Sequence, residues 1–132
     1  RAVGVSQAAF DFALQYSKER EQFGKPICEH QAIRMKLSEM AVELEASRQL
    51  VYYAASMKDS GKRCDLEAGM AKVKAAKAVE FITREAMQIL GGYGYSKEFP
   101  VERYWRDGRV ISIFEGTSEI QHEVIAKSIL NK

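Results

Sequence analysis

Side chains between residues 28 and 59 divide into an inner and an outer set with the period of a helix bundle. The inner set is mostly apolar and recurs at alternating steps of four and three residues, whereas Lys36 and Glu43 lie off this line. The inner positions are Ile33, Leu37, Met40, Leu44, Ser47, Val51 and Ala54. This pattern predicts one long helix from about Cys28 to Asp59 with a single face turned toward its partners.

Two further segments have helical patterns of different composition. Residues 2–18 are apolar over most of the helical circumference, so this helix needs neighbours on several sides. Residues 65–90 have small side chains in the first half of their inner line, which permits close helix approach. These inner residues are Ala68, Ala71, Ala75, Ala78, Ile82, Ala86 and Ile89. Shorter helices are predicted for residues 100–110 and from Ser118, where Ser118 and Gln121 fit a capping box.

Glycine and proline mark the connections between these helices. The glycine and proline of residues 24–26 disfavour continuation of the first helix. Residues 60–63 have the composition of a turn between antiparallel helices, since glycine tolerates a left-handed cap. No segment shows sustained strand alternation. The predicted fold class is therefore all-α, an antiparallel (up-down) four-helix bundle with an additional C-terminal helix.

Composition narrows the class of protein. At 132 residues, 46% of them hydrophobic, the chain has the size of one globular domain over residues 1–132. A formal charge of +2 gives little reason to expect nucleic acid as a partner, and no stretch is long enough for a membrane span. Cys28 and Cys64 have no metal-binding spacing, so no metal site is predicted and the compartment is expected to be intracellular. Because a helical pattern already runs at Arg1, we expect the chain to be a fragment.

A first unusual segment covers residues 20–27, where a helix gives way to a tight turn. Arg20 there is suited to bind a phosphate, and Phe23 to lie against a flat ring. Alternatively, Arg20 offsets the negative end of the first helix while Phe23 fills the core. The residue types alone favour this second interpretation. The following pair of His30 and Gln31 is a weak signal by itself.

A second unusual segment is glycine-rich and covers residues 88–95. It follows a helix instead of leading from a strand into one, so it is neither a Rossmann fingerprint nor a P-loop. One interpretation is a left-handed helix cap at Gly91 or Gly92, with Tyr93 and Tyr95 packing back on the helix. The other is that the second glycine lets the backbone approach a ligand closely. These residues do not decide between the two.

The third unusual segment, residues 111–121, is the most informative. Glu115 is set between Phe114 and Gly116, directly before a helix start. An apolar setting disfavours the ionised carboxylate, so Glu115 is a candidate general base once a ligand excludes water. Gly116 leaves room for a substrate, and the free amides of the helix start are suited to an anionic or carbonyl group. Alternatively, Glu115 only stabilises the positive end of that helix.

Taken together and in order, these segments resemble the acyl-CoA dehydrogenase family over essentially the whole chain. The matching segments are residues 4–7, 20–24, 30–31, 88–95, 100–103, 106–107 and 114–120. Each motif is weak by itself, but several in family order and spacing are specific. The resemblance implies that the chain is the C-terminal bundle of a flavoenzyme subunit that also has an N-terminal helical domain and a middle β-domain.

The resemblance also implies roles for individual residues. Glu115 falls on the glutamate that removes the α-proton of an acyl-CoA thioester while FAD accepts a hydride from the β-carbon. Phe114, where tyrosine is frequent, and Gly116 fall on positions that border the substrate. The residues implied to contact FAD of the same subunit are Thr117, Ser118 and Glu119. Those implied to reach FAD of a neighbouring subunit are Arg20, Gln22, Phe23, His30, Gln31, Gln88, Gly91 and Gly92.

The implied assembly is a homotetramer that passes its electrons to an electron-transfer flavoprotein, in a mitochondrial matrix or a bacterial cytoplasm. Two alternatives stay open beside the dehydrogenase. In the first, the chain is a helical oligomerisation module without activity of its own. In the second, the complete protein is an acyl-CoA oxidase, whose reduced flavin reacts with oxygen. Acyl chain length and branching depend on pocket residues outside this sequence.

Overall fold

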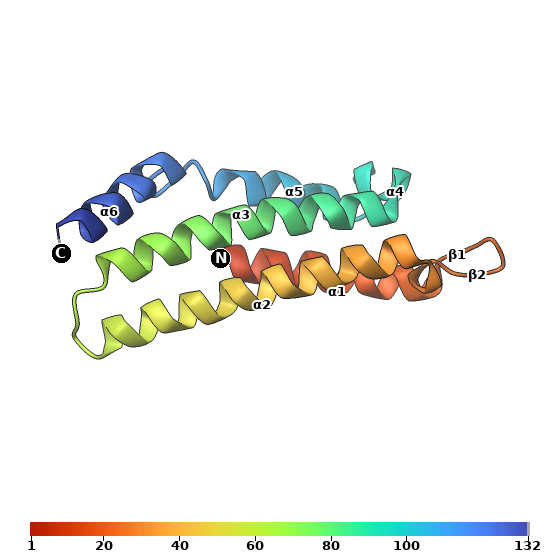
Figure 1. Cartoon of the computed structure of the whole chain (residues 1–132). Coiled ribbons are helices and arrows are strands. Elements are labelled where there is room, and N and C mark those ends of the chain that lie inside the picture. The colour runs from red at the N-terminus through yellow and green to blue at the C-terminus, as the bar shows by residue number, and fades with distance from the viewer. Residues whose placement is uncertain (132) are drawn as a thin grey trace.

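The computed structural model describes residues 1–131 as a bundle of helices (Figure 1). Of the described residues, 79% are helical, which confirms the predicted all-α class. The elements in chain order are α1 (Ala2–Glu19), β1 (Glu21–Gln22), β2 (Lys25–Pro26), the 3-10 helix η1 (Ile27–Glu29), α2 (Gln31–Asp59), α3 (Asp65–Leu90), α4 (Gly92–Tyr95), α5 (Val101–Val110) and α6 (Ser118–Leu130). None of the helices in the described residues is long and apolar enough to cross a membrane.

Helix α3 is the centre of the bundle. It contacts α1, α2, α5 and α6, and its small side chains Ala75, Ala76 and Ala78 are almost fully buried, so neighbouring helices approach closely. The main core cluster comprises Ala9, Ala13, Ile27, Met40, Leu44, Ala78, Ile82, Ala86, Ile89, Leu90 and Val101. Helices α1, α2, α3 and α5 form the up-down bundle, and α6 is the additional C-terminal helix (Figure 1).

The long helices agree with the pattern except at the start of α2. Helix α3 spans the predicted residues 65–90. Helix α2 begins at Gln31 rather than at Cys28, because Ile27–Glu29 form a 3-10 helix and His30 is extended. The β1–β2 hairpin and the one-turn helix α4 are not predicted by the sequence pattern, since both are too short to show a periodicity.

The N-terminal cap of α6 is Thr117, not Ser118. Thr117 has an extended backbone (φ −57°, ψ 160°), and its hydroxyl accepts a hydrogen bond from the N–H of Ile120 at 3.3 Å. Ser118 is already the first helical residue. The predicted capping box of Ser118 and Gln121 is therefore wrong by one residue.

Glu85 on α3 is a buried carboxylate, with 8% of its surface exposed. Lys36 from α2 donates a hydrogen bond to its Oε2, and Arg84 Nη2 lies 2.9 Å from its Oε1. Burial by itself would raise the pKa of Glu85, but the hydrogen bonds from Lys36 and Arg84 outweigh it. The pKa of Glu85 therefore lies below its ordinary value of 4.5.

We expect Glu85→Gln to reduce the loss of stability in acid. A carboxylate with a lowered folded pKa adds stability above its unfolded pKa of about 4.5, and this stability is lost as the pH falls through the folded pKa. Below about pH 5 the parent should lose more free energy of unfolding than the variant. Urea unfolding at a series of pH values measures this loss. The control is Glu39→Gln, which removes an exposed carboxylate. Equal acid sensitivity of the parent and Glu85→Gln would contradict the prediction.

Candidate active site

The loop that carries Glu115 joins α5 to α6 and contains two successive residues with unusual backbone angles. Glu115 (φ 53°) and Gly116 (φ 92°) take positive φ in succession. The N–H of Ser118 then reaches back to the carbonyl of Ser112 at 3.0 Å, which closes the loop. A positive φ on a residue other than glycine costs about 1–3 kcal/mol. Surrounding contacts therefore hold Glu115 in this conformation.

Lys72 on α3 supplies three of those contacts. Its ammonium donates to the backbone carbonyls of Ile111 at 2.7 Å, Phe114 at 3.2 Å and Gly116 at 2.7 Å. A lysine ammonium has three N–H donors, so all of them are used. Lys72 does not stand out in the sequence, because a lysine on a helix is ordinarily a solvated side chain.

A pocket of about 410 Å³ lies beside Glu115, between α1, α3 and the loop. Its lining residues are Arg1, Ala2, Val3, Val51, Ala71, Lys72, Ala75, Ile111, Phe114 and Glu115. The Glu115 side chain is 69% exposed, and its Oε1 lies 3.5 Å from Nη1 of Arg1. The Arg1 guanidinium also lies 5.8 Å from the centre of the Phe114 ring. Within residues 1–131 the carboxylate therefore stands at an open rim beside a cation, and not in the apolar setting expected from the sequence.

The space next to Gly116 is occupied on one side by Gln121. A Cβ added to Gly116 would lie 2.5 Å from Nε2 of Gln121, the far end of a flexible side chain. The room for a substrate that the sequence suggested at Gly116 is thus limited on that side by an amide group. The remaining lining of the nearby pocket is largely apolar.

Thr117, Ser118 and Glu119 form the start of α6 and line a smaller hollow of about 300 Å³. Lys77 and Arg109 add cations to its lining. Hydrogen bonds from the Glu119 backbone and from the Thr117 hydroxyl lower the pKa of the Glu119 carboxyl. The same lining also holds the carboxylates of Glu80 and Glu119, and Arg109 Nη1 lies 2.9 Å from Glu80 Oε1, so the charges of the hollow balance. The N–H groups of Ser118 and Ile120 already have acceptors within the protein, so an anionic group would bind here only by replacing some of these partners.

The predicted turn residues form the β1–β2 hairpin. Phe23 (φ 55°) and Gly24 (φ 78°) make a tight turn with two positive φ angles in succession. Phe23 is 94% exposed, so the interpretation that it fills the core is wrong. Its ring packs edge to face on the His30 ring, with ring centres 6.0 Å apart, and His30 Nε2 lies 3.1 Å from the Gln22 carbonyl oxygen. Arg20 is the exposed C-terminal cap of α1 and Gln31 the first residue of α2.

The end of α3 lies near the hairpin and contains the second glycine-rich segment. Gly91 has φ 60° and ψ −132°, a conformation that favours glycine. A Cβ at Gly92 would meet nothing within 4 Å, so no packing demands a glycine there. Of the two tyrosines, Tyr93 stacks on Phe99 with ring centres 5.0 Å apart, whereas Tyr95 is 83% exposed. The Tyr93 ring also lies edge to face on Tyr16 of α1, so its aromatic partners belong to α1 and to the segment before α5 rather than to the helix that it follows. Gln88, on the last turn of α3, is also exposed.

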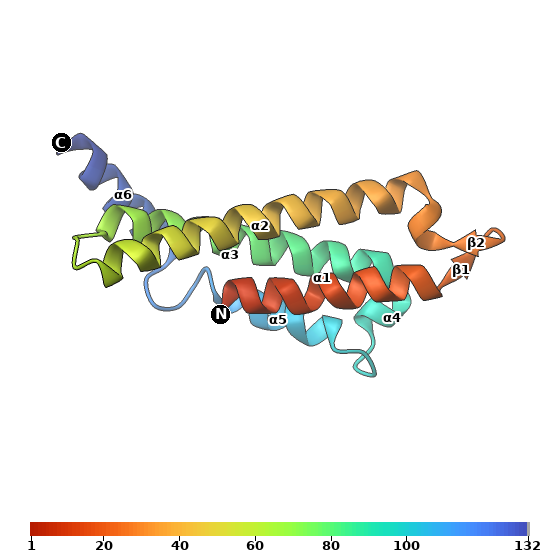
Figure 2. The ribbon, with the colours of Figure 1, turned by 90° about the horizontal axis from the view of Figure 1, so that it is seen from below.

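Helix α1 separates the two groups of predicted site residues. Arg1 at its start is close to Glu115, and Arg20 caps its other end. Its 18 residues correspond to a length of about 27 Å. Figure 2 shows the hairpin beyond that far end of α1 and α4 beside it. A single copy of the chain therefore does not bring all predicted site residues together.

A family model described as "Acyl-CoA dehydrogenase, C-terminal domain" matches residues 1–130. The chain belongs to the acyl-CoA dehydrogenase family. Over 130 residues it is 50% identical to the mitochondrial short-chain specific acyl-CoA dehydrogenase of Bos taurus. The matched region covers 98% of this chain and 32% of that protein. Over 132 residues it is 49% identical to a subunit of the caffeyl-CoA reductase-Etf complex of Acetobacterium woodii, covering 100% of this chain and 35% of that subunit.

Solved structures agree with this acyl-CoA dehydrogenase assignment. Butyryl-CoA dehydrogenase from Megasphaera elsdenii matches with a TM-score of 0.96 and 46% identity, over 98% of this chain and 34% of that chain. The acyl-CoA dehydrogenase domain described above thus spans about a third of the length of these relatives.

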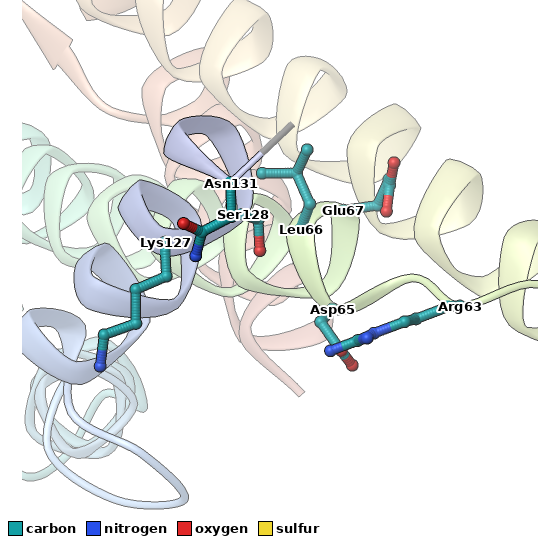
Figure 3. A pocket seen from close by; sticks show the side chains of 7 residues that line it. All are labelled: Arg63, Asp65, Leu66, Glu67, Lys127, Ser128 and Asn131. Atoms are coloured by element: carbon teal, nitrogen blue, oxygen red, sulfur yellow. The ribbon is translucent and has the colours of Figure 1, made fainter.

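A further pocket of this acyl-CoA dehydrogenase domain, of about 420 Å³, lies between the start of α3 and the end of α6 (Figure 3). Its lining residues are Arg63, Asp65, Leu66, Glu67, Lys127, Ser128 and Asn131. Arg63 and Asp65 already pair with each other at 2.7 Å. This pocket contains none of the residues matched to the family's site, so the pocket beside Glu115 is the candidate active site.

Proposed function

We propose that the chain is the C-terminal third of a flavin-dependent acyl-CoA dehydrogenase subunit, with Glu115 as its catalytic base. The observation that carries this proposal is the position of Glu115 in a chain of this family. Two consecutive positive φ angles present its carboxylate at the rim of a pocket with a largely apolar lining. An apolar pocket fits the acyl chain of a thioester, and an exposed carboxylate at its rim can reach the carbon next to the carbonyl.

In the proposed reaction the Glu115 carboxylate takes the α-proton of the acyl-CoA. The α C–H bond breaks, and its electrons form the α,β double bond as the β-hydrogen leaves with its own electron pair. Bound FAD would supply the acceptor for this hydride. Phe114 and Gly116 stand on either side of Glu115 in the chain and would border the acyl group.

The FAD site would be divided between two subunits. Thr117, Ser118 and Glu119 line the hollow at the start of α6 and would contact FAD of their own subunit. The other predicted contacts, Arg20, Gln22, Phe23, His30, Gln31, Gln88, Gly91 and Gly92, belong to the opposite group at the far end of α1. An aromatic ring that is 94% exposed and a glycine backbone with open space fit a flat cofactor held by a neighbour. The separation along α1 supports this division, because one chain cannot apply both groups to one cofactor.

Phe23→Ala tests the proposed role of the hairpin. We expect the complete subunit to bind FAD about two- to ten-fold more weakly, because a stacked ring contributes about 0.5–1.5 kcal/mol. Stability of the apoprotein should change little, since Phe23 is 94% exposed. Flavin absorbance after ultrafiltration measures how much FAD the subunit retains. Trp105→Ala, which removes a 47% exposed ring from α5, is the control, and equal FAD retention in both variants would argue against a flavin contact.

A homotetramer is the assembly that we propose. Exposed apolar side chains on α2 and α6 fit contacts between copies of the chain. They are Met35, Val42, Tyr52, Tyr53, Ile120, Ile129 and Leu130. The proposed electron acceptor is an electron-transfer flavoprotein, in keeping with the name of the Acetobacterium woodii relative.

The reaction class is tested by anaerobic bleaching of the flavin with a panel of acyl-CoAs, on the complete subunit. Bleaching by a saturated acyl-CoA supports the dehydrogenase. Absence of bound flavin would instead support the helical oligomerisation module. Rapid reoxidation of the reduced flavin by air would support the acyl-CoA oxidase.

A reductase is a second candidate, because the Acetobacterium woodii relative is named as part of a reductase complex. The same residues serve both directions, since a base that removes an α-proton can also return it. In that direction Glu115 gives the proton to the α-carbon as the double bond is reduced. Oxidation of chemically reduced flavin by an α,β-unsaturated acyl-CoA, faster than bleaching by the saturated one, would favour this candidate.

A further inference from the structure

Lys72 is the side chain that connects the Glu115 loop to the core of the bundle. It lies on α3 between residues that are buried on both sides, with Ala71 at 6% and Val73 at 7% exposure. Its three hydrogen bonds reach 39 to 44 residues along the chain, to carbonyls at the end of α5 and in the loop. The loop is thereby fastened to the most central helix of the fold.

The pattern of acceptors goes beyond an ordinary helix cap. The carbonyl of Ile111 is one of those left free at the end of α5, where a lysine commonly binds. The other two carbonyls belong to Phe114 and Gly116, the residues directly before and after Glu115. Fixing both of these carbonyls restricts the backbone on either side of Glu115, which has the unfavourable φ of 53°.

We infer that Lys72 is a positioning residue, which holds the Glu115 backbone in its left-handed conformation and so aims the carboxylate at the substrate. This inference rests on the proposed function, in which Glu115 is the base. The site is specific for lysine, because one compact ammonium satisfies three converging carbonyls, whereas the planar fork of arginine points its donors differently.

Lys72→Met in the complete subunit tests the inference, because methionine preserves much of the apolar stem and removes the donors. We expect the rate of flavin reduction at saturating acyl-CoA to fall about 100-fold, as for a reacting group displaced by about 1 Å. The concentration for half-maximal rate should stay within about two-fold, since the acyl pocket is retained. The isotope effect with α-deuterated substrate should increase, because proton removal becomes slower. Lys74→Met, which loses only the surface pair with Glu43, is the matched control.

A second measurement does not depend on turnover. Amide hydrogen exchange in the peptide containing residues 111–117 should become at least about ten-fold faster in Lys72→Met, while the core peptides of α3 stay protected. If Lys72→Met fails to fold, Lys72→Arg replaces it in both measurements, with a smaller expected fall in rate because charge is retained.

The outcomes separate this inference from the proposed function. Undiminished flavin reduction in Lys72→Met, beside an inactive Glu115→Gln, would overturn the positioning role and leave Glu115 as the base. An equal loss of the flavin reduction rate in Lys74→Met would also overturn it, since the effect would then be general. Unchanged amide hydrogen exchange of residues 111–117 in Lys72→Met would overturn it as well. Full activity of Glu115→Gln would overturn both together.

Discussion

Replacing Glu115 by glutamine in the complete subunit should slow flavin reduction by acyl-CoA at least about 1,000-fold, within the range that general base catalysis contributes. Glutamine has nearly the same shape but cannot accept the α-proton as a carboxylate does. FAD content should not change, because the proposed cofactor contacts lie elsewhere, in the hairpin, at the end of α3 and at the start of α6. Stopped-flow absorbance of the flavin under anaerobic conditions measures the rate.

The control for this variant is Glu123→Gln, on the exposed face of α6. Glu123 lies 3.9 Å from Lys127 in a surface pair, and its replacement should leave the rate within about two-fold. If Glu115→Gln retains FAD and reduces it at the parental rate, another residue of the complete subunit is the base. Loss of activity in Glu123→Gln as well would indicate a general effect of removing charge from this region.

Gly94→Ala is expected to cause a large loss of stability. An added Cβ would stand 2.5 Å from the carbonyl oxygen of Met87 and 2.8 Å from its Cα. Both are backbone atoms of α3, the central helix, so neither can move without shifting the core. We expect the free energy of unfolding to fall by about 2–3 kcal/mol, the upper part of the range for overpacked sites. Chemical unfolding followed by circular dichroism measures the change.

Gly4→Ala provides the matched comparison for Gly94→Ala. Gly4 is exposed within α1, and a Cβ there would meet nothing within 4 Å. Alanine in a helix interior is favoured over glycine by about 0.5–1 kcal/mol, so this variant should be slightly more stable than the parent. A Gly94→Ala protein as stable as the parent would show that α3 and α4 can move apart at little cost.

The long helices could be predicted from the sequence because each has its own periodic face and its own end signals. Helix α3 is the clearest case, with small inner residues and the Gly91 end, and its bounds are confirmed. The hairpin could not be predicted in the same way. Its strands have two residues each, and its turn needs a positive φ at Phe23, a residue type that rarely adopts it.

The site could be predicted only in part. Glu115 stands out from its local sequence, but its choice over other acids at helix starts depended on the resemblance to the family. Whether it and the other predicted residues have their roles stays a prediction. Lys72 could not be found from the sequence, because its three acceptors lie about 40 residues away and are backbone atoms that carry no residue signature.

Helix α6 has no buried residue, and in Figure 2 its C-terminal end points away from the rest of the bundle. In a single chain α6 packs mainly on α3 with its residues only partly buried, so this helix should open locally more often than the whole domain unfolds. The Glu115 loop directly precedes it, yet three of the loop's anchoring bonds come from Lys72 on α3. Local opening of α6 should therefore leave the position of the Glu115 carboxylate unchanged, because the Lys72 hydrogen bonds hold the loop on α3 while α6 is detached.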